Sequence, residues 1–194
     1  MEETMTPSIT DGQIDKAVDI FRSVLRKHRS ELGSDAVQQA LGIKKLGPEL
    51  LAVFRKWVEA VSDIIVRRVT VNLSRSPQQA LLATLARQYV NDDVKAMPRG
   101  TAEEAEVFFF PVKRYVSDEE LEKEFELRGF KPADPYSLAA VNEADPAFAD
   151  EHPNATHWKD ADGKWCYAAF GRWIDERLLL VSRSASVWAG LWWF

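Results

Sequence analysis

The sequence predicts an α+β fold, with a mainly helical N-terminal region followed by a smaller domain of mixed strands and helices. Apolar residues recur at helical spacing over most of residues 1–101, whereas residues 102–194 contain several segments that alternate with a period of two. Hydrophobic residues make up 46% and charged residues 28% of the chain, as is typical of a globular protein with a buried core. Residues 1–101 hold 15 Lys and Arg against 12 Asp and Glu, and residues 102–194 hold 10 against 18. This asymmetry indicates two regions with different surfaces.

The first helix is predicted to begin at Thr10. Thr10 and Gln13 have the spacing of a capping box, and apolar residues then recur at helical spacing. Gly33 is expected to end this segment, and Ser34 is expected to cap a short helix through Leu41.

The next predicted helix starts at about Pro48, which suits a first helical turn. Its apolar residues form one wide stripe, with charged residues on the opposite face. The stripe is wide enough to pack inside an N-terminal helical bundle, which is the interpretation we favour. The alternative is an assembly surface, as in a homo-oligomer.

The segment "VRRVTVNL" changes the period to two and predicts a strand near residues 66–73. Ser76 and Pro77 then predict a helix that runs to about Tyr89. The polar connector "NDDVKAMPRGTAEE" follows, and we place the domain boundary there. The predicted domains are therefore residues 1–101 and residues 102–194.

The second domain begins with "EVFFFPV", which predicts a buried strand that ends at Pro111. Ser117 and Glu120 form a capping box for the helix "DEELEKEFELR", which Gly129 is expected to close. Asp134 and the proline after it predict another helix through about residue 144.

The remaining elements are a short helix and several strands. An Asp-Pro pair at residues 145–146 predicts the short helix, and Asp162-Gly163 predicts a two-residue hairpin turn between aromatic, alternating flanks. Two more strands are expected around residues 178–183 and 191–194.

Composition excludes several classes of protein. No apolar run approaches the ~20 residues of a membrane-spanning helix, so no membrane span is expected. The acidic second half disfavours binding to nucleic acid. Cys166 is the single cysteine, which excludes an intrachain disulfide and makes a reducing cytoplasm the default expectation. Display on a surface by another route stays open.

His152, His157 and Cys166 lie within 15 residues and raise the hypothesis of a zinc-dependent enzyme. Zinc ligands usually occur in close pairs from two elements, and here the cysteine is alone. Asp160 and Asp162 fit the hairpin turn better than a metal site. We therefore predict no catalytic residue, no metal site and no cofactor, and keep a metal-dependent enzyme as an alternative.

The C-terminal stretch "RWIDERLLLVSRSASVWAGLWWF" contains four of the seven tryptophans, separated by leucines, serines and alanines in no evident pattern. Tryptophan supplies large, rigid contact area both in cores and in binding faces. We interpret the tryptophans as a structural frame and the residues between them as a binding face.

The stretch "DPYSLAAVNEADPAFADEHPNATHWKDADGKWCYAAFGRW", with the aromatic tail after it, resembles uncharacterised proteins from bacterial lineages with small genomes. In these relatives the tail resembles the diversified segment of variable proteins of diversity-generating retroelements. The resemblance implies a C-type lectin-like C-terminal domain, of the type shared with formylglycine-generating enzymes. That domain displays side chains diversified by an error-prone reverse transcriptase, which mutates at adenines.

The resemblance divides the tail into frame positions and diversified positions. The frame positions are Phe170, Arg172, Trp173, Arg177, Val181, Arg183, Trp188, Trp192 and Trp193. The diversified, ligand-binding positions are Ile174, Leu178, Leu180, Ser182, Ser184, Ser186, Val187, Ala189 and Leu191. Gly171, Leu179, Ala185 and Gly190 are weaker candidates for diversification.

The residue types at the diversified positions fit this mechanism. Adenine mutagenesis of an AAC codon cannot produce Lys, Glu, Gln, Met or Trp, and none of these occupies a diversified position. The expected function is a non-enzymatic protein whose variable face binds an unknown protein or surface ligand. The alternative is a protein–protein interaction or assembly module with no diversified face.

Overall fold

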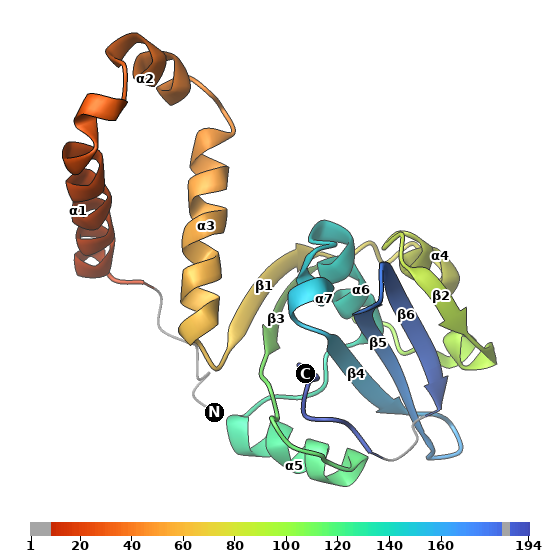
Figure 1. Cartoon of the computed structure of the whole chain (residues 1–194). Helices are drawn as coiled ribbons and strands as arrows, with labels where there is room; N and C mark the ends of the chain where they lie inside the picture. The colour runs from red at the N-terminus through yellow and green to blue at the C-terminus, as the bar shows by residue number, and fades with distance from the viewer. Residues whose placement is uncertain (1–8, 184–186) are drawn as a thin grey trace. The chain divides into compact units, whose positions relative to one another are not determined.

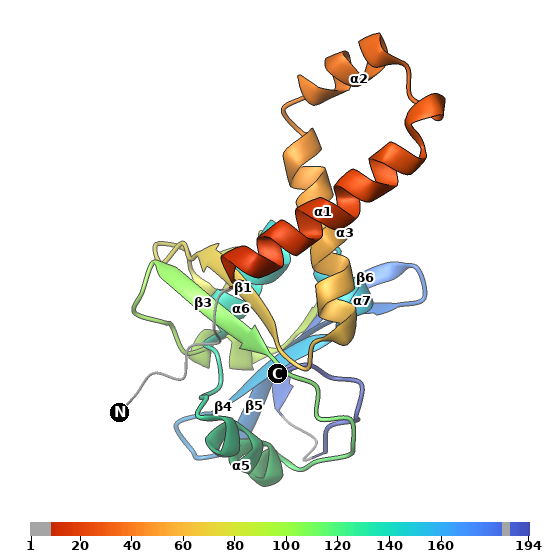
Figure 2. The same cartoon turned by 90° about the vertical axis from the view of Figure 1, so that its left-hand side faces the viewer.

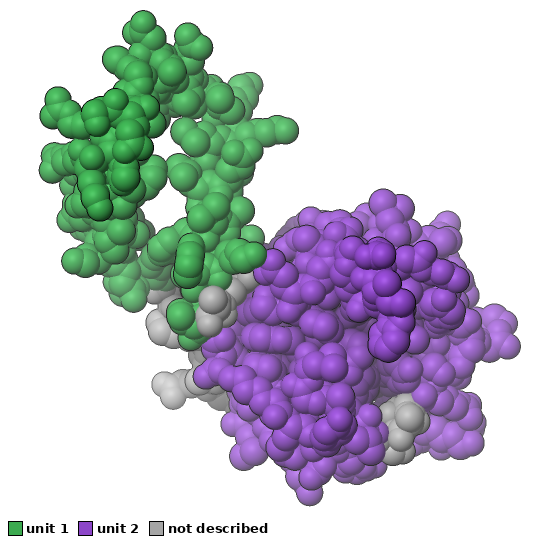
Figure 3. All heavy atoms as spheres, in the orientation of Figure 1, with its two compact units in different colours: residues 1–61 green, residues 62–194 purple. Residues whose placement is uncertain are grey.

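The computed structural model describes residues 9–183 and 187–194 and confirms the α+β fold. The chain divides into two compact units, Met1–Val61 and Ser62–Phe194 (Figure 3). Among the described residues, no helix is long and apolar enough to cross a membrane.

The first unit is helical (Figure 1). It contains α1 (Asp11–Lys27), the short 3₁₀ helix η1 (Arg29–Glu31), α2 (Ser34–Leu41) and α3 (Leu46–Val61). The predicted capping box at the start of α1 is confirmed, because Thr10 and Gln13 bond each other's backbone N–H groups. Gly33, and not Ser34 as predicted, occupies the N-cap position of α2.

The apolar stripe of α3 is not packed inside a helical bundle, so that prediction is wrong. Trp57 in its middle is 72% exposed, and none of the described side chains of residues 9–61 is buried. The three helices of this unit therefore keep their apolar faces accessible.

The second unit contains two sheets with helices between their strands (Figures 1 and 2). Its elements are β1 (Ile65–Thr70), α4 (Pro77–Leu82), β2 (Arg87–Val90), the 3₁₀ helix η2 (Asp92–Ala96), β3 (Glu104–Phe109), α5 (Asp118–Arg128), α6 (Pro135–Ala144), α7 (Phe148–Glu151), β4 (Asn154–Lys159), β5 (Trp165–Trp173) and β6 (Glu176–Arg183).

The smaller sheet joins the two regions that the sequence analysis had separated. β1 pairs antiparallel with β3, with Ile65 opposite Phe109 and Thr70 opposite Glu104. One strand comes from each side of the predicted boundary at residue 101, and their pairing places both in the same unit. The division found in the structure therefore lies near residue 61 and not near residue 101.

The larger sheet has the strand order β2-β6-β5-β4, in which β2 is parallel to β6 and the other pairs are antiparallel. The helix predicted to run from residue 77 to about Tyr89 instead ends at Leu82. Leu85 has a positive φ of 57°, which is incompatible with a continuing right-handed helix. The chain then enters the edge strand β2, which the sequence analysis had assigned to the helix because its apolar residues fit helical spacing.

Local signals in the rest of this unit agree well with the structure. The Ser117–Glu120 capping box starts α5, and Gly129, with a φ of 71°, ends it. Asp134 caps α6 as predicted. The hairpin differs slightly, because Asp160 pairs with Lys164 and leaves a three-residue loop in which Gly163 takes the left-handed conformation. Residues 191–194 do not form the predicted strand, and within them Trp193 makes isolated bridges to Pro111 and Asn154.

The larger sheet has hydrophobic residues packed on both faces. The main cluster packs α6 and the small sheet against one face, which carries Phe170, Leu179 and Val181. A second cluster joins α5 and the end of the chain to Ala155 and Ala169 on the opposite face. We call these the inner and outer faces of the larger sheet.

Both hydrophobic clusters lie within residues 62–194. A fragment with these residues is therefore expected to unfold cooperatively at nearly the temperature of the second unit in the full chain. Limited proteolysis of the full chain should release it by cleavage first between residues 61 and 65. Early cleavage in the predicted connector, residues 91–105, would contradict this division.

Candidate ligand-binding face

Strand β6 separates the predicted binding residues from the core by simple alternation. Leu179 and Val181 point to the inner face and are fully buried. Leu178, Leu180 and Ser182 alternate with them, so they lie on the outer face, where they are half-buried. Three of the predicted diversified residues therefore share one side of one strand.

Helix α5 and the chain terminus cover the outer face over β4 and β5 but contribute no cluster residue over β6. The parallel register of β2 and β6 places Arg87 beside Leu178 and Tyr89 beside Leu180. Tyr89 is 49% exposed. The outer sides of β6 and β2 thus form a continuous, partly apolar patch, which we call the display face.

Polar side chains border the display face. Arg87 forms an ion pair with Glu176 at 2.6 Å and lies over the ring of Tyr89. Asn91 donates a side-chain hydrogen bond to the Ser182 hydroxyl at 3.3 Å. An aromatic and aliphatic centre with a polar border is the usual composition of a protein-binding surface.

Ile174 lies in the tight turn that joins β5 to β6. Trp173 and Glu176 pair across the turn, so only Ile174 and Asp175 form the loop. Ile174 is 81% exposed and has a positive φ of 55°. A β-branched residue rarely adopts this conformation, because its Cβ substituents crowd the backbone.

Replacing Ile174 with glycine is therefore expected to raise the free energy of unfolding by about 1 kcal/mol, since glycine adopts a positive φ without steric cost. Urea denaturation of the two proteins measures the difference. The matched control is Ile20→Gly in α1, which should lower helix stability by about the same amount. A destabilised Ile174→Gly protein would show that the side chain is needed for packing.

The chain terminus alternates between buried and exposed residues. Trp188 and Phe194 are buried in the second cluster, whereas Val187 and Leu191 are exposed and Ala189 is half-buried. The predicted diversified residues Ser184 and Ser186, and the weaker candidate Ala185, lie outside the described residues.

Gly171 of β5 lies between the chain terminus and β6, because it pairs with Leu178 of β6 and lies close to Trp192. A Cβ atom on Gly171 would lie 3.9 Å from the Trp192 ring. The indole of Trp192 therefore borders the display face.

The frame arginines are held by carboxylates. Asp150 accepts hydrogen bonds from Arg177 at 2.9 Å and from Arg172 at 3.3 Å. The bonds from Arg177, more than those from Arg172, hold the pKa of the Asp150 carboxyl below its usual value. Arg183 pairs with Asp160 at 3.2 Å and with Asp93 at 3.5 Å. These pairs fix both ends of β6 on its inner side.

The aromatic frame is confirmed only in part. Phe170, Val181 and Trp188 are buried, and Trp192 and Trp193 are half-buried. Trp173 is 70% exposed, so its assignment to a buried frame is wrong. It ends β5 beside the tight turn, beyond the reach of both hydrophobic clusters.

Two weaker candidates for diversification are excluded by packing. Leu179 is fully buried in the main cluster. A Cβ atom on Gly190 would lie 2.6 Å from the backbone nitrogen of Arg114. A diversified residue at either position would disrupt the core or the backbone contact.

His157 is buried in a polar cluster that the sequence did not reveal. Its Nδ1 lies 2.9 Å from Asp118 Oδ1 and its Nε2 lies 2.7 Å from Glu122 Oε1. The indole of Trp188 donates to the same Asp118 oxygen at 2.9 Å, and Trp165 stacks on the imidazole. The cluster ties α5 and the chain terminus to β4.

The proposed zinc ligands do not converge. His157 lies on the outer face of the sheet, whereas Cys166 pairs with Trp158 and points into the inner core. Burial raises the pKa of the Cys166 thiol, which leaves it unreactive. His152 contacts Trp193 edge-to-face and Phe148 in a tilted arrangement. Within residues 9–183 and 187–194, no group of three His, Cys, Asp or Glu side chains is arranged to hold a metal ion.

Sequence reasoning missed Arg87, Tyr89 and Asn91 at the display face, because they were assigned to a helix and a connector. The alternation of residues 87–90 and their Tyr and Val were the available strand signals. The partner strand β6 lies about ninety residues away in sequence, and no local pattern indicates that pairing.

Comparisons with protein-family models, with curated proteins and with solved structures find no match for this chain. The fold and the display face define an α+β protein in which a partly exposed, partly apolar sheet face is supported by a buried core.

Proposed function

We propose that the chain is a non-enzymatic ligand-binding protein whose display face is a hypervariable surface diversified by a retroelement. In this proposal the C-terminal part of the second unit is a C-type lectin-like display domain. The order β3, α5, α6, α7, β4, β5, β6 is compatible with such a domain, and so is the return of Phe194 to pair with Phe110 just after β3.

The observation that carries the proposal is the strained Ile174 at the tip of the exposed turn. Selection for folding alone favours glycine or asparagine at a positive φ. An AAC template codon encodes asparagine, and one adenine change converts it to isoleucine. Diversification without a stability filter therefore accounts for a residue that the turn itself disfavours.

The leucines of β6 support the same conclusion. The display face carries Leu178 and Leu180, and neither leucine belongs to either hydrophobic cluster of the described residues, although Leu180 lies opposite Ala169. Apolar side chains in such a position contribute little to folding, but they give a ligand apolar area to bury.

The supporting structure under the display face suits repeated substitution. The buried residues Val181 and Leu179 and the ion pairs of Arg177 and Arg183 hold β6 from its inner side. Changes at Leu178, Leu180 or Ser182 leave all of these contacts in place. The ligand expected for such a surface is another protein, bound through apolar and aromatic anchors.

Sequencing the gene and its flanking DNA in independent isolates tests the proposal. We expect substitutions in the codons for Ile174, Leu178 and Leu180, at positions where a nearby imperfect repeat has adenine, and a reverse transcriptase gene beside that repeat. The codon for Leu127, a residue on α5 that is as exposed as Ile174, is the control and should vary far less. Equal variation at Leu127 and Ile174, with no repeat, would instead favour an interaction module without a diversified face.

A further inference from the structure

The helices of the first unit carry more exposed apolar surface than isolated helices can support. Five side chains in the stripe of α1 and seven in α3 are each at least 42% exposed. Helices of this length derive most of their stability from packing of an apolar face against a partner. Covering twelve such side chains removes on the order of 1,000 Å² of apolar surface from water, the size of one side of a stable interface.

Helix α1 also has an unusual distribution of charge along one flank of its apolar stripe. Asp11, Asp15 and Asp19 recur every four residues on this flank in the first half of the helix. Arg22 and Arg26 continue the same flank in the second half, and Arg29 follows in η1. The flank is therefore acidic at one end and basic at the other.

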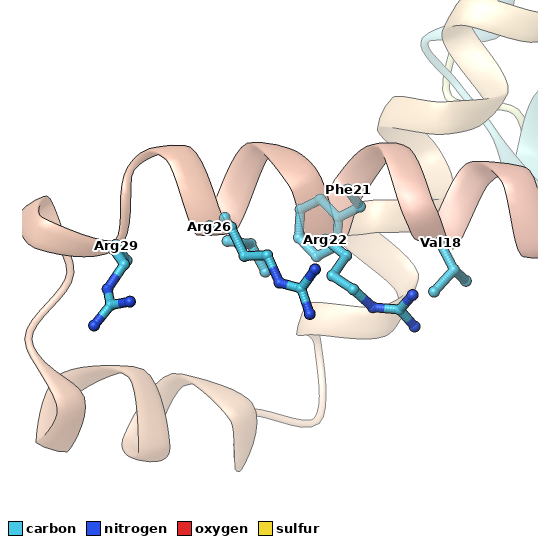
Figure 4. A pocket seen from close by; sticks show the side chains of 6 residues that line it. Val18, Phe21, Arg22, Arg26 and Arg29 are labelled. Carbon is cyan, nitrogen blue, oxygen red and sulfur yellow. The ribbon is translucent and has the colours of Figure 1, made fainter.

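The basic end adjoins an apolar hollow. A hollow of about 510 Å³ is lined by Val18, Phe21 and Leu25, together with Arg22, Arg26 and Arg29. Figure 4 shows the side chains of Arg22 and Arg26 in α1 and of Arg29 in η1 extending toward the same side. An apolar floor with a basic rim suits an amphipathic helix that has acidic residues along one flank.

The first half of α1 is such a helix, with Ile14 and Val18 in its stripe and three aspartates on its flank. In an antiparallel pair of helices related by a two-fold axis, a given flank of one helix lies against the same flank of the other helix. In a parallel pair, that flank lies against the opposite flank of the other helix. Antiparallel pairing would thus set the acidic end of one α1 against the basic end of the other.

One register satisfies both the charges and the apolar residues. Placing Asp15 near Arg26 of the second copy also places Asp19 near its Arg22. The same register brings Val18 close to Phe21 of the second copy, and the symmetry repeats every pair.

The net charge of the first unit does not oppose this association. Residues 1–61 contain nine Lys and Arg and nine Asp and Glu, a formal net charge of zero. Two first units therefore approach each other without overall repulsion.

We propose that the first unit is a homodimerisation module in which α1 pairs antiparallel with α1 of a second copy and α3 covers the pair. The dimer would carry two display faces. Two linked faces raise the avidity for a ligand that presents repeated sites.

Sedimentation equilibrium of the full chain, over a range of concentrations, tests the dimer. The wild type is expected to dimerise. Two triple variants test the charge pairs. The first makes the acidic end of the flank basic, by Asp11→Lys, Asp15→Lys and Asp19→Lys. The second makes the basic end acidic, by Arg22→Glu, Arg26→Glu and Arg29→Glu. The dimer of each variant alone should have a dissociation constant about 100-fold higher, because the two charge pairs named above, four by symmetry, change from attractive to repulsive.

An equimolar mixture of the two triple variants should form a heterodimer, because an all-basic flank then meets an all-acidic one. Circular dichroism checks that both variants keep their helices. A second pair of variants tests the apolar contact. Phe21→Asp should abolish dimerisation, whereas Ile20→Asp, an exposed neighbour outside the stripe, should leave it unchanged.

A monomeric wild type would overturn the proposal and would show that another segment or partner covers the stripe. Triple variants that dimerise like the wild type, or a mixture that stays monomeric, would overturn it as well. None of these outcomes bears on the display face, so failure here is distinct from failure of the proposed function.

Discussion

Replacing His157 with alanine is expected to lower the free energy of unfolding by about 3–5 kcal/mol. The side chain is fully buried, and both of its ring nitrogens face carboxylates, Asp118 and Glu122. The imidazole lies within hydrogen-bond distance of the buried Asp118 carboxylate and contacts the rings of Trp165 and Phe125. Its removal opens a cavity and takes a hydrogen-bond partner from a buried carboxylate.

Urea denaturation measures this change, and His28 provides the matched control. His28 makes an equally short contact, 2.8 Å to Glu31, but both side chains are exposed. Because exposed ion pairs contribute little, His28→Ala should change the free energy of unfolding by no more than about 0.5 kcal/mol. Similar small losses from both variants would contradict the assignment of His157 as the buried link between α5 and β4.

Replacing Trp188 with alanine is also expected to cost about 3–5 kcal/mol, the usual range for a large buried aromatic. Its indole packs against Tyr167, Trp192 and Phe194, and its N–H donates to Asp118. Truncation would open a cavity in the second cluster and remove a hydrogen bond from a buried carboxylate.

Trp173 is the control for this prediction, because it is a tryptophan of the same tail that lies outside both clusters. Trp173→Ala should change the free energy of unfolding by about 0.5 kcal/mol or less, as is usual for exposed residues. Thermal melts of both variants measure the difference. Equal losses would show that the exposed indole has a packing partner.

Local features of the sequence predicted the elements that depend on neighbouring residues. The capping boxes at Thr10 and Ser117 and the Asp134 cap depend on residues two or three positions apart, and the structure contains all of them. The faces of β6 could also be predicted from the sequence, because side chains alternate along a strand and so Leu178 and Leu180 lie on the same side.

Features that depend on distant pairing could not be predicted in this way. The edge strand at Tyr89 exists because it pairs with β6, and the boundary near residue 61 exists because β1 pairs with β3. His157 shows the same limit, since its carboxylate partners Asp118 and Glu122 lie more than thirty residues away in sequence. Trp173 and Trp188 have the same side chain, and only their tertiary surroundings distinguish an exposed residue from a buried one.

The central claim is that the display face tolerates substitution while the frame beneath it does not. A protease-resistance screen of two displayed libraries tests it most directly. One library randomises Ile174, Leu178, Leu180 and Ser182, and the other randomises Phe170, Leu179, Val181 and Trp188. We expect most members of the first library to resist proteolysis as well as the wild type, and nearly all members of the second to be cleaved. Libraries that lose resistance to the same extent would contradict the claim and identify the tail as ordinary core.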